Sequence, residues 1–318
     1  MFRKEINRTL IEEIKNKDSV ALLFSGGVDS LSMLFSCFDV GIRPTLYCFT
    51  TDGYISEDLM ASRKVADIFG LSLKEIYIPT DIATIKEDVY RLMDRFKIRK
   101  PTQIQCTQPF LYVAAAIKEE YAVSGICADD ILGNFRACAV VKKDIGQYYS
   151  KRYVAFNDIE KSSFCYIRDV FKDVDVKLIA PYKTNKKLAE FLFSKNFDDL
   201  HRPKQKQLTL DYYKEIEQNG LYRKSSNAQV NSRIREEHLK LLAANQWGYT
   251  GISGIYNRMY YKYIADVLNN ASKDHVTLND FLQEFKIKLT GTMIDKINEM
   301  LLEHDKRAEL VKGTIYIY

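Results

Sequence analysis

One short segment constrains the fold more than any other: a run of apolar residues that leads directly into a loop of small residues and then into a helical pattern. Residues 20–24 (VALLF) have the composition of a short, fully buried strand, residues 25–30 read SGGVDS, and residues 30–40 predict the helix that follows. Glycines let the backbone approach a ligand closely, and the amides that begin a helix attract anions. The segment therefore predicts an anion-binding loop between a strand and a helix, although a plain turn rich in small residues would have the same composition.

The alternation of strand and helix continues to about residue 126. Strands are expected at 44–50, 73–78 and 121–126, and helices at 5–17, 56–69, 82–96 and 108–120. Short strands that alternate with helices indicate crossover connections, and hence a mostly parallel sheet with helices on both faces. Ligands bind such sheets beyond the carboxyl ends of the strands. Both the loop at 25–30 and the acidic segment at 127–130 fall at strand ends.

The sequence changes character after about residue 150. Residues 182–245 are rich in Lys and Arg and helical in pattern, 254–270 are rich in aromatic residues, and 277–312 predict two short amphipathic helices before a strand-like run at 314–318. We therefore predict an α/β domain at residues 1–150 and a mainly helical region at 151–318 that covers the ligand site.

Composition limits the class of protein. The 318 residues carry a net charge of +5, a mild surplus that permits an anionic partner but does not require one. No stretch reaches the about 20 uninterrupted apolar residues of a membrane span, and the first residues lack the apolar run of a secretory signal, so we expect a cytoplasmic protein with no membrane partner. The six cysteines are scattered without a CxxC pair, which argues against a disulfide framework or a structural zinc site.

The loop residues indicate how an anion would be held. Ser25 and Ser30 can add hydroxyl donors to the backbone amides, whereas Asp29 would face a phosphate only across a Mg²⁺ ion. The Walker pattern GxxxxGK[ST] is absent from the sequence, so the chain carries a different kind of phosphate loop.

At this point the sequence resembles a known family. The loop matches that of the N-type ATP pyrophosphatases, or PP-loop superfamily, through the string Ser25, Gly26, Gly27, Val28, Asp29, Ser30. This superfamily includes asparagine synthetases, transfer-RNA thiolases and related adenylating enzymes. The resemblance implies an α/β fold of the adenine nucleotide alpha hydrolase-like (HUP) type, with a parallel sheet and helices on both faces.

The synthetase domain of asparagine synthetase is the most similar member. Its second signature reads approximately SGEGxDExxGGY, and residues 124–135 of this chain read SGICADDILGNF. Its PFLD segment and its later lysine-bearing helix resemble Pro181-Tyr182 and the run 206–208. The likeness covers roughly residues 20–230 and is strongest at the loop and the second signature.

The resemblance implies ATP and Mg²⁺ as ligands and gives roles to individual residues. Asp29 and Asp129 would hold Mg²⁺ on the pyrophosphate of ATP, as hard carboxylate oxygens can. Ser124 and Gly125 would line the adenylate. Lys206 would face the phosphates and stabilise the transition state.

Several residues depart from the family pattern. Ile126 replaces the glutamate that handles the amine in asparagine synthesis, Cys127 replaces the glycine after it, and Thr184 replaces the aspartate of PFLD. Residue 2 is Phe2 rather than the nucleophilic cysteine of a glutaminase domain. The nitrogen donor would then be free ammonia, another amine, or ammonia delivered by a separate subunit.

These features predict an enzyme that adenylates a substrate, releases pyrophosphate and then forms an amide, with the acceptor unidentified. One alternative is a thiolase-like transferase that modifies a nucleobase or transfer RNA. Cys106 and Cys138 would carry the sulfur in such an enzyme, although buried thiols are the preferred interpretation. Another alternative is an ATP-binding subunit with reduced catalysis.

The basic residues leave further alternatives open. A solvated helix lysine is the alternative interpretation of Lys206, and Lys204, two residues away, competes with it for the role of the catalytic lysine. The stretch 201–206 and the pair Arg223-Lys224 could follow an RNA backbone or cover the phosphates of ATP. The four histidines, His201 among them, are dispersed and predict solvated or structural roles.

Overall fold

The computed structural model describes residues 1–98, 101–133, 138, 140–141, 143–157, 163–224, 228–244, 265, 275–277, 291–302, 308–311 and 314–317. The chain divides into two compact units, one made of Met1–Thr80 with Gln105–Glu236 and the other of Asp81–Ile104 with Glu237–Tyr318. These units are bounded at other positions than residue 150, and the division into 1–150 and 151–318 stays a prediction about function.

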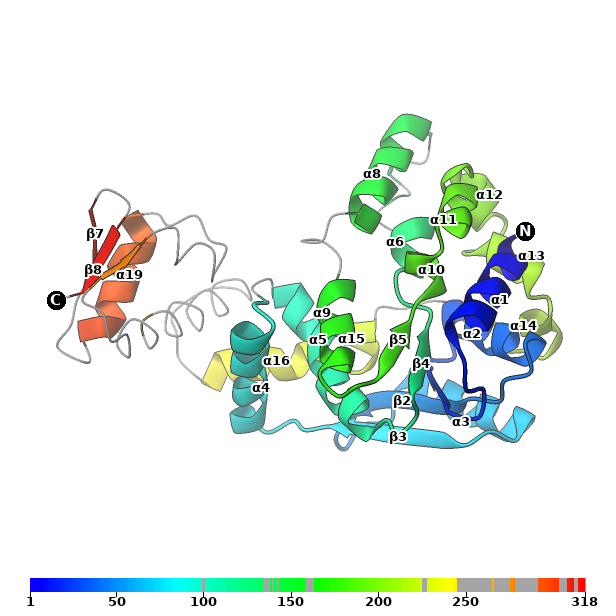
Figure 1. Cartoon of the computed structure of the whole chain (residues 1–318), viewed down its shortest axis with the longest axis horizontal. Coiled ribbons are helices and arrows are strands. Elements are labelled where there is room, and N and C mark those ends of the chain that lie inside the picture. Colours follow the sequence, from blue (N-terminus) through cyan, green and yellow to red (C-terminus); the bar gives the residue numbers. More distant parts are fainter. Residues whose placement is uncertain are drawn as a thin grey trace. The chain divides into compact units, whose positions relative to one another are not determined.

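A five-stranded parallel sheet forms the centre of the first unit (Figure 1). Its strands are β1 (Val20–Leu23), β2 (Thr45–Thr51), β3 (Leu73–Ile78), β4 (Tyr121–Ser124) and β5 (Lys177–Ile179). Their order is β3-β2-β1-β4-β5, and every neighbouring pair is parallel. The chain therefore winds outward from β1 in one direction and then continues from β4 in the other. The switch between β1 and β4 is the place where such sheets bind ligands.

The central strands are buried because helices cover both faces of the sheet. All four residues of β4 are buried, and in β1 Val20, Ala21 and Leu22 are at most 3% exposed. This confirms the predicted α/β fold with its parallel sheet. The sequence did not predict β5, because three residues with an exposed Lys177 are too short to show a strand pattern.

Helices connect and cover these strands. In the first unit they include α1 (Phe2–Glu13), α2 (Val28–Asp39), α3 (Glu57–Phe69), α6 (Ala128–Leu132), α8 (Ile145–Asn157) and α9 (Phe164–Lys172). Helix α3 shows why these segments are helical: the Ser56 hydroxyl accepts a hydrogen bond from the Leu59 amide at 3.1 Å, and Gly70 ends the helix with φ 59°.

Helix α5 (Pro101–Ala116) starts earlier than the predicted helix at 108–120. Its first half carries polar side chains that are nevertheless buried, namely Gln103, Gln105, Thr107 and Gln108. A buried polar face gives no apolar periodicity, so the sequence pattern detected only the second half of the helix.

Short helices follow β5, as the pattern at 182–245 predicted. They are α10 (Pro181–Thr184), α11 (Lys186–Phe193), α12 (Phe197–His201), α13 (Gln207–Tyr212), α14 (Glu215–Gln218), α15 (Ala228–Asn231) and α16 (Ile234–Ala244), of which α16 continues from the first unit into the second.

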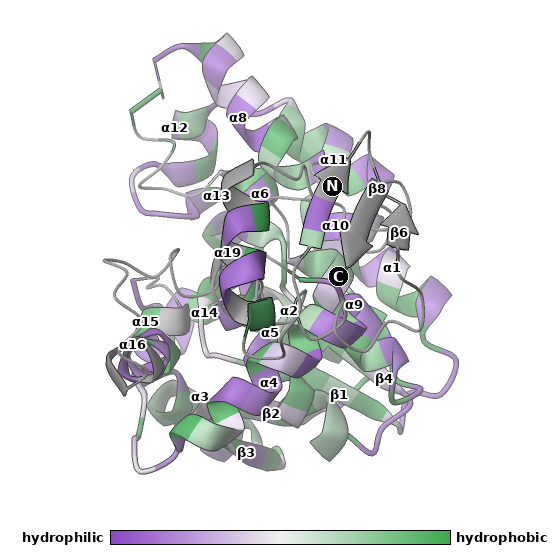
Figure 2. Cartoon of the chain, turned by 90° about the vertical axis from the view of Figure 1, so that its left-hand side faces the viewer, coloured by the Kyte–Doolittle hydropathy of each residue, from purple (hydrophilic) through white to green (hydrophobic). Residues whose placement is uncertain are grey.

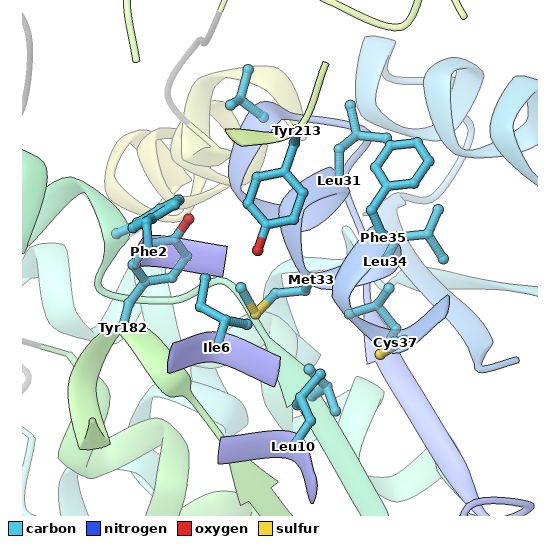
Figure 3. Packing of buried hydrophobic residues seen from close by; sticks show 14 of the residues in the cluster. Phe2, Ile6, Leu10, Leu31, Met33, Leu34, Phe35, Cys37, Tyr182 and Tyr213 are labelled. Atoms are coloured by element: carbon cyan, nitrogen blue, oxygen red, sulfur yellow. The ribbon is translucent and has the colours of Figure 1, made fainter. Parts of the chain in front are cut away.

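Helix α2 lies inside the hydrophobic core of the first unit. Leu31, Met33 and Leu34 are at most 1% exposed, and Figure 3 shows them among side chains of α1 and the aromatic residues that follow β5. Two tyrosines at this core keep their hydroxyls paired: Tyr182 bonds the Ser32 hydroxyl at 2.9 Å and Tyr213 bonds the Ser36 hydroxyl at 2.6 Å. Helix α2, which follows the loop, is therefore packed against α1 and bonded to Tyr182 and Tyr213.

The second unit contains α4 (Ile82–Arg95), α19 (Gly291–Leu301) and a three-stranded antiparallel sheet in the order β6-β8-β7. These strands are β6 (His275–Thr277), β7 (Ala308–Val311) and β8 (Thr314–Ile317), of which β8 confirms the strand-like run at 314–318. Helix α4 is amphipathic, with hydrophilic and hydrophobic stretches that alternate along it in Figure 2. Helix α19 matches one of the two helices expected at 277–312. The other, and the aromatic-rich segment apart from Ala265, lie outside the described residues.

Among the described helices, none combines the length and the apolar character that a bilayer crossing requires.

The position of α2 predicts a large effect of truncation in its core face. Leu34→Ala should lower the free energy of unfolding by about 2–5 kcal/mol, because the side chain is fully buried. Ile11→Ala, at a site that is 58% exposed on α1, should change it by less than about 0.5 kcal/mol. Urea denaturation of the two variants measures this difference, and equal losses would contradict the described packing.

Candidate functional site

The loop and the second signature meet at the carboxyl ends of β1 and β4. The strands are in register so that Leu23 lies opposite Ser124, which brings residues 25–30 and 125–129 together. Gly125 makes this approach feasible: a Cβ on it would lie 2.9 Å from the carbonyl carbon and oxygen of Asp29. No larger residue fits there without moving the Asp29 backbone.

The loop at 25–30 is shaped for a ligand that contacts backbone. Gly26 has φ 68°, and a Cβ on it would lie 2.6 Å from the Cβ of Ala61. The Ser30 hydroxyl donates to the Gly27 carbonyl at 3.0 Å, and the first helical bond of α2 runs from the Leu31 amide to the same carbonyl. The amides that precede Leu31 in α2 have no partner within the helix, so they can bind an anion.

Arg223 binds the backbone carbonyls of this loop. Its Nη2 donates to the Ser25 carbonyl at 2.6 Å, and its Nε lies 3.4 Å from the Gly26 carbonyl. Asp58 pairs with the guanidinium and also accepts from Asn231 Nδ2 at 2.7 Å. In a trans peptide the carbonyl and the next amide point in opposite directions. Because Arg223 binds these two carbonyls, the amides that follow them point away from its guanidinium.

Lys206 joins the two acidic residues of the site. Its Nζ lies 2.8 Å from Asp129 Oδ1 and also donates to Asp29 Oδ2. The Lys206 side chain is 3% exposed, that of Asp29 is 21% exposed and that of Asp129 is 50% exposed. The structure thus brings together all three residues that the resemblance made catalytic.

Burial and neighbouring charges shift the pKa values of these three groups in different ways. Burial works to lower the pKa of Lys206, but the charges of Asp129 and Asp29 outweigh it and raise the pKa, so the ammonium keeps its proton. Burial raises the pKa of Asp29, against the charge of Lys206. The charge of Lys206 lowers the pKa of Asp129, whose side chain is the more exposed of the two carboxylates.

The acidic pair suits a hard cation that shares its ligands with phosphate. Asp29 Oδ1 is buried and finds no hydrogen-bond partner among the residues that the structure describes. Within this same part of the chain, no cluster of three or more His, Cys, Asp or Glu residues could form a metal site from protein ligands alone. Two carboxylates with phosphate oxygens and waters are the usual environment of Mg²⁺ at nucleotide sites.

The geometry distinguishes between the two lysines that the sequence left open. Lys204 is 49% exposed, pairs with Glu217 and lies over the ring of Tyr222, with 5.3 Å between its Nζ and the ring centroid. Lys206 is the one that reaches the carboxylates. Lys206 is therefore not a solvated lysine, whereas Lys204 is exposed and lies between α12 and α13.

The second signature keeps its backbone shape despite its departures. Cys127 has φ 69°, the left-handed conformation that glycine adopts most easily, at the position where the family pattern has glycine. Ser124 is buried, and its hydroxyl accepts from the Ile126 amide at 3.1 Å. Ile126 packs against a small apolar cluster that includes Cys127 and Phe164, so no charge replaces the family glutamate there.

The two thiols considered for sulfur transfer differ in exposure. Cys106 is partly buried, and Cys138 is buried. Burial raises the pKa of the Cys138 thiol in spite of the nearby charges of Lys151 and Arg152. A thiol with a raised pKa is a poor nucleophile at neutral pH.

Some contacts of the site could not be found from the sequence. Arg223 carried only a charge signal, which suggested phosphates or RNA rather than the loop carbonyls. Ser32 donates to the Asp29 carbonyl at 2.7 Å and bonds Tyr182, and only Tyr182 had a signal, through the Pro181-Tyr182 match.

Comparison with known proteins identifies the family. A model of the asparagine synthase family matches residues 1–272. The match spans most of the chain, so the protein belongs to the asparagine synthase family, whose members are ATP-using PP-loop proteins. No curated protein is similar enough to count as a match.

Solved structures show weaker likenesses. A predicted subunit of tRNA methyltransferase from Methanocaldococcus jannaschii DSM is 19% identical, with a TM-score of 0.32 over 56% of this chain and 74% of its own. U34-tRNA thiolase NcsA from Methanococcus maripaludis, solved with its 4Fe-4S cluster, is 16% identical, with a TM-score of 0.32 over 76% of this chain and 78% of its own. At this level of similarity neither likeness bears on function.

His201 makes the stability of the protein dependent on pH. Burial lowers its pKa from 6.5 to about 4. As the pH falls, the unfolded chain takes up this proton before the folded one, so the free energy of unfolding should decrease between about pH 6.5 and pH 4. The difference corresponds to at most about 3 kcal/mol. Urea denaturation at several pH values should show a shallower decline for His201→Asn than for the wild type, and parallel curves would contradict the assignment.

Proposed function

We propose that this chain is an AMP-forming enzyme that adenylates an acceptor and releases pyrophosphate from ATP. The observation that supports this most is the convergence of Asp29, Asp129 and Lys206 beside the glycine loop, at the switch point between β1 and β4. ATP-using chemistry agrees with the family, and the choice of reaction rests on the geometry and charges of these residues.

The residues of the site would act mainly on the phosphates. The amides at the start of α2 would hold the phosphates of ATP. Asp29 and Asp129 would hold Mg²⁺, which would supply positive charge against the leaving pyrophosphate. Lys206 keeps its proton and can turn from the carboxylates to a phosphate oxygen, where negative charge develops as the bond to the α-phosphorus breaks.

The acceptor side would involve residues after β4. Ser124 and Gly125 would line the adenylate, and an acceptor oxygen would attack the α-phosphorus. We propose that an amine, or ammonia, then displaces AMP to form an amide. Membership of the asparagine synthase family supports the proposal that this second step forms an amide. A thiolase-like transfer to a nucleobase needs an ionised thiol, and the raised pKa of Cys138 counts against that residue as the nucleophile.

The test is product analysis with purified protein. With Mg-ATP and a panel of amino acids, amines and bulk transfer RNA, one acceptor should stimulate the release of AMP and pyrophosphate in equal amounts. Lys206→Met should lower kcat by about 100-fold or more, because it removes the cation at the phosphates. Lys204→Met should retain wild-type kcat, since this exposed lysine pairs with Glu217 instead.

Other products would favour a different function for this chain. Release of ADP and phosphate would contradict adenylation. Tight ATP binding without turnover would favour the ATP-binding subunit instead. Stimulation by transfer RNA alone, with loss of activity in Cys106→Ser or Cys138→Ser, would favour the nucleobase-modifying transferase.

A further inference from the structure

Lys206 has a backbone conformation that the surrounding structure must impose. Its φ is 62°, in the left-handed region that residues with a side chain rarely adopt. It lies at the N-cap of α13, where no side chain caps the helix. The direction in which its side chain leaves the backbone depends on this conformation. A contact that fixes the backbone therefore also determines where the ammonium lies.

His201 makes a direct contact with the backbone amide of Lys206. The imidazole is 1% exposed, its Nδ1 accepts a hydrogen bond from the Lys206 amide at 3.2 Å, and its Nε2 lies 3.0 Å from the Leu132 carbonyl. The carbonyl can only accept, so the proton of the neutral ring lies on Nε2 and leaves Nδ1 free to accept. Because burial lowers the pKa of the ring, it stays in this neutral form near pH 7.

The same ring connects Lys206 with the helix that carries Asp129. Leu132 ends α6, and Asp129 lies in its first turn. The Phe197 ring packs against the imidazole with a centroid distance of 4.9 Å, which limits how far the imidazole can tilt. The imidazole therefore lies between the Lys206 amide and the end of α6, and its contact with the amide is the one that fixes the backbone of Lys206.

We propose that His201 is a positioning residue that sets Lys206 against Asp29 and Asp129, so that its ammonium is correctly placed for the phosphates of ATP. This inference rests on the proposed function, because it assigns Lys206 to the reacting phosphates. The alternative is a buried histidine that contributes only to packing, and the chemistry of the two ring nitrogens separates these roles.

Two substitutions each keep one of the two contacts. The Oδ1 atom of asparagine is as many bonds from Cβ as Nδ1 of histidine, so His201→Asn can still accept from the Lys206 amide. The amide nitrogen of glutamine matches Nε2 in the same way, so His201→Gln can still donate to Leu132 but loses the contact with Lys206. Asparagine also leaves the larger void, so it should be the less stable variant.

The experiment measures kcat and KM for pyrophosphate release, together with Tm, in both variants at a temperature where both are folded. We expect His201→Asn to have the lower Tm and yet retain kcat within about threefold. His201→Gln should lose about tenfold or more in kcat with a smaller change in KM, since a misplacement of about 1 Å can cost about 100-fold. A packing role predicts the reverse order, with activity following Tm. Higher activity in His201→Gln, or wild-type activity in both variants, would overturn the proposal.

A separate outcome concerns the proposed function. If the wild type releases no pyrophosphate with any acceptor, the proposed function fails, and crystal structures of the two variants decide the positioning role alone. The 2.8 Å contact between Lys206 and Asp129 should persist in His201→Asn and be lost in His201→Gln. The same contact in both variants would overturn the role of His201.

Discussion

The pairing of Lys206 with Asp29 and Asp129 is the interaction on which the rest of the site depends. It joins Lys206 to a carboxylate 177 residues away in the sequence, and it places a cation between two acidic groups that would otherwise repel each other. Lys206 and Asp29 form the more buried part of this pairing, and removing one partner of a buried pair typically costs about 3–5 kcal/mol, because a charge is left without compensation. A buried pair adds little stability compared with apolar packing. Its presence here is therefore better explained by chemistry than by folding.

The surrounding structure keeps these three charges in place from several directions. Gly125 lets the end of β4 touch the backbone of Asp29, and Arg223 fixes the carbonyls of the loop. Tyr182 and Tyr213 bond to α2 from segments 150 and 177 residues further along the chain. The loop is therefore preorganised, and binding of phosphate would require the Lys206 side chain to move rather than the backbone. The preorganised backbone of the loop can stabilise a transition state without rearrangement of its own.

The sequence predicted the features of the fold that depend on local apolar patterns. Strands β1 to β4 and the loop at 25–30 could be located because buried parallel strands are short apolar runs that end in turn residues. Strand β5 and the first half of α5 could not, because one is three residues long and the other buries glutamines. In the site, resemblance supplied Asp29, Asp129 and Lys206. The choice of Lys206 over Lys204 and the contact of His201 with the Lys206 amide depend on distances between segments, which no single-chain pattern records.

The most direct test of the account is a crystal structure with Mg²⁺ and an ATP analogue that cannot be cleaved between the α- and β-phosphates. The β- and γ-phosphates should contact the amides at the start of α2. Asp29 and Asp129 should bind the metal, and the Lys206 ammonium should lie within about 3 Å of a phosphate oxygen. A nucleotide bound away from the loop, with Lys206 still paired to both carboxylates, would contradict it.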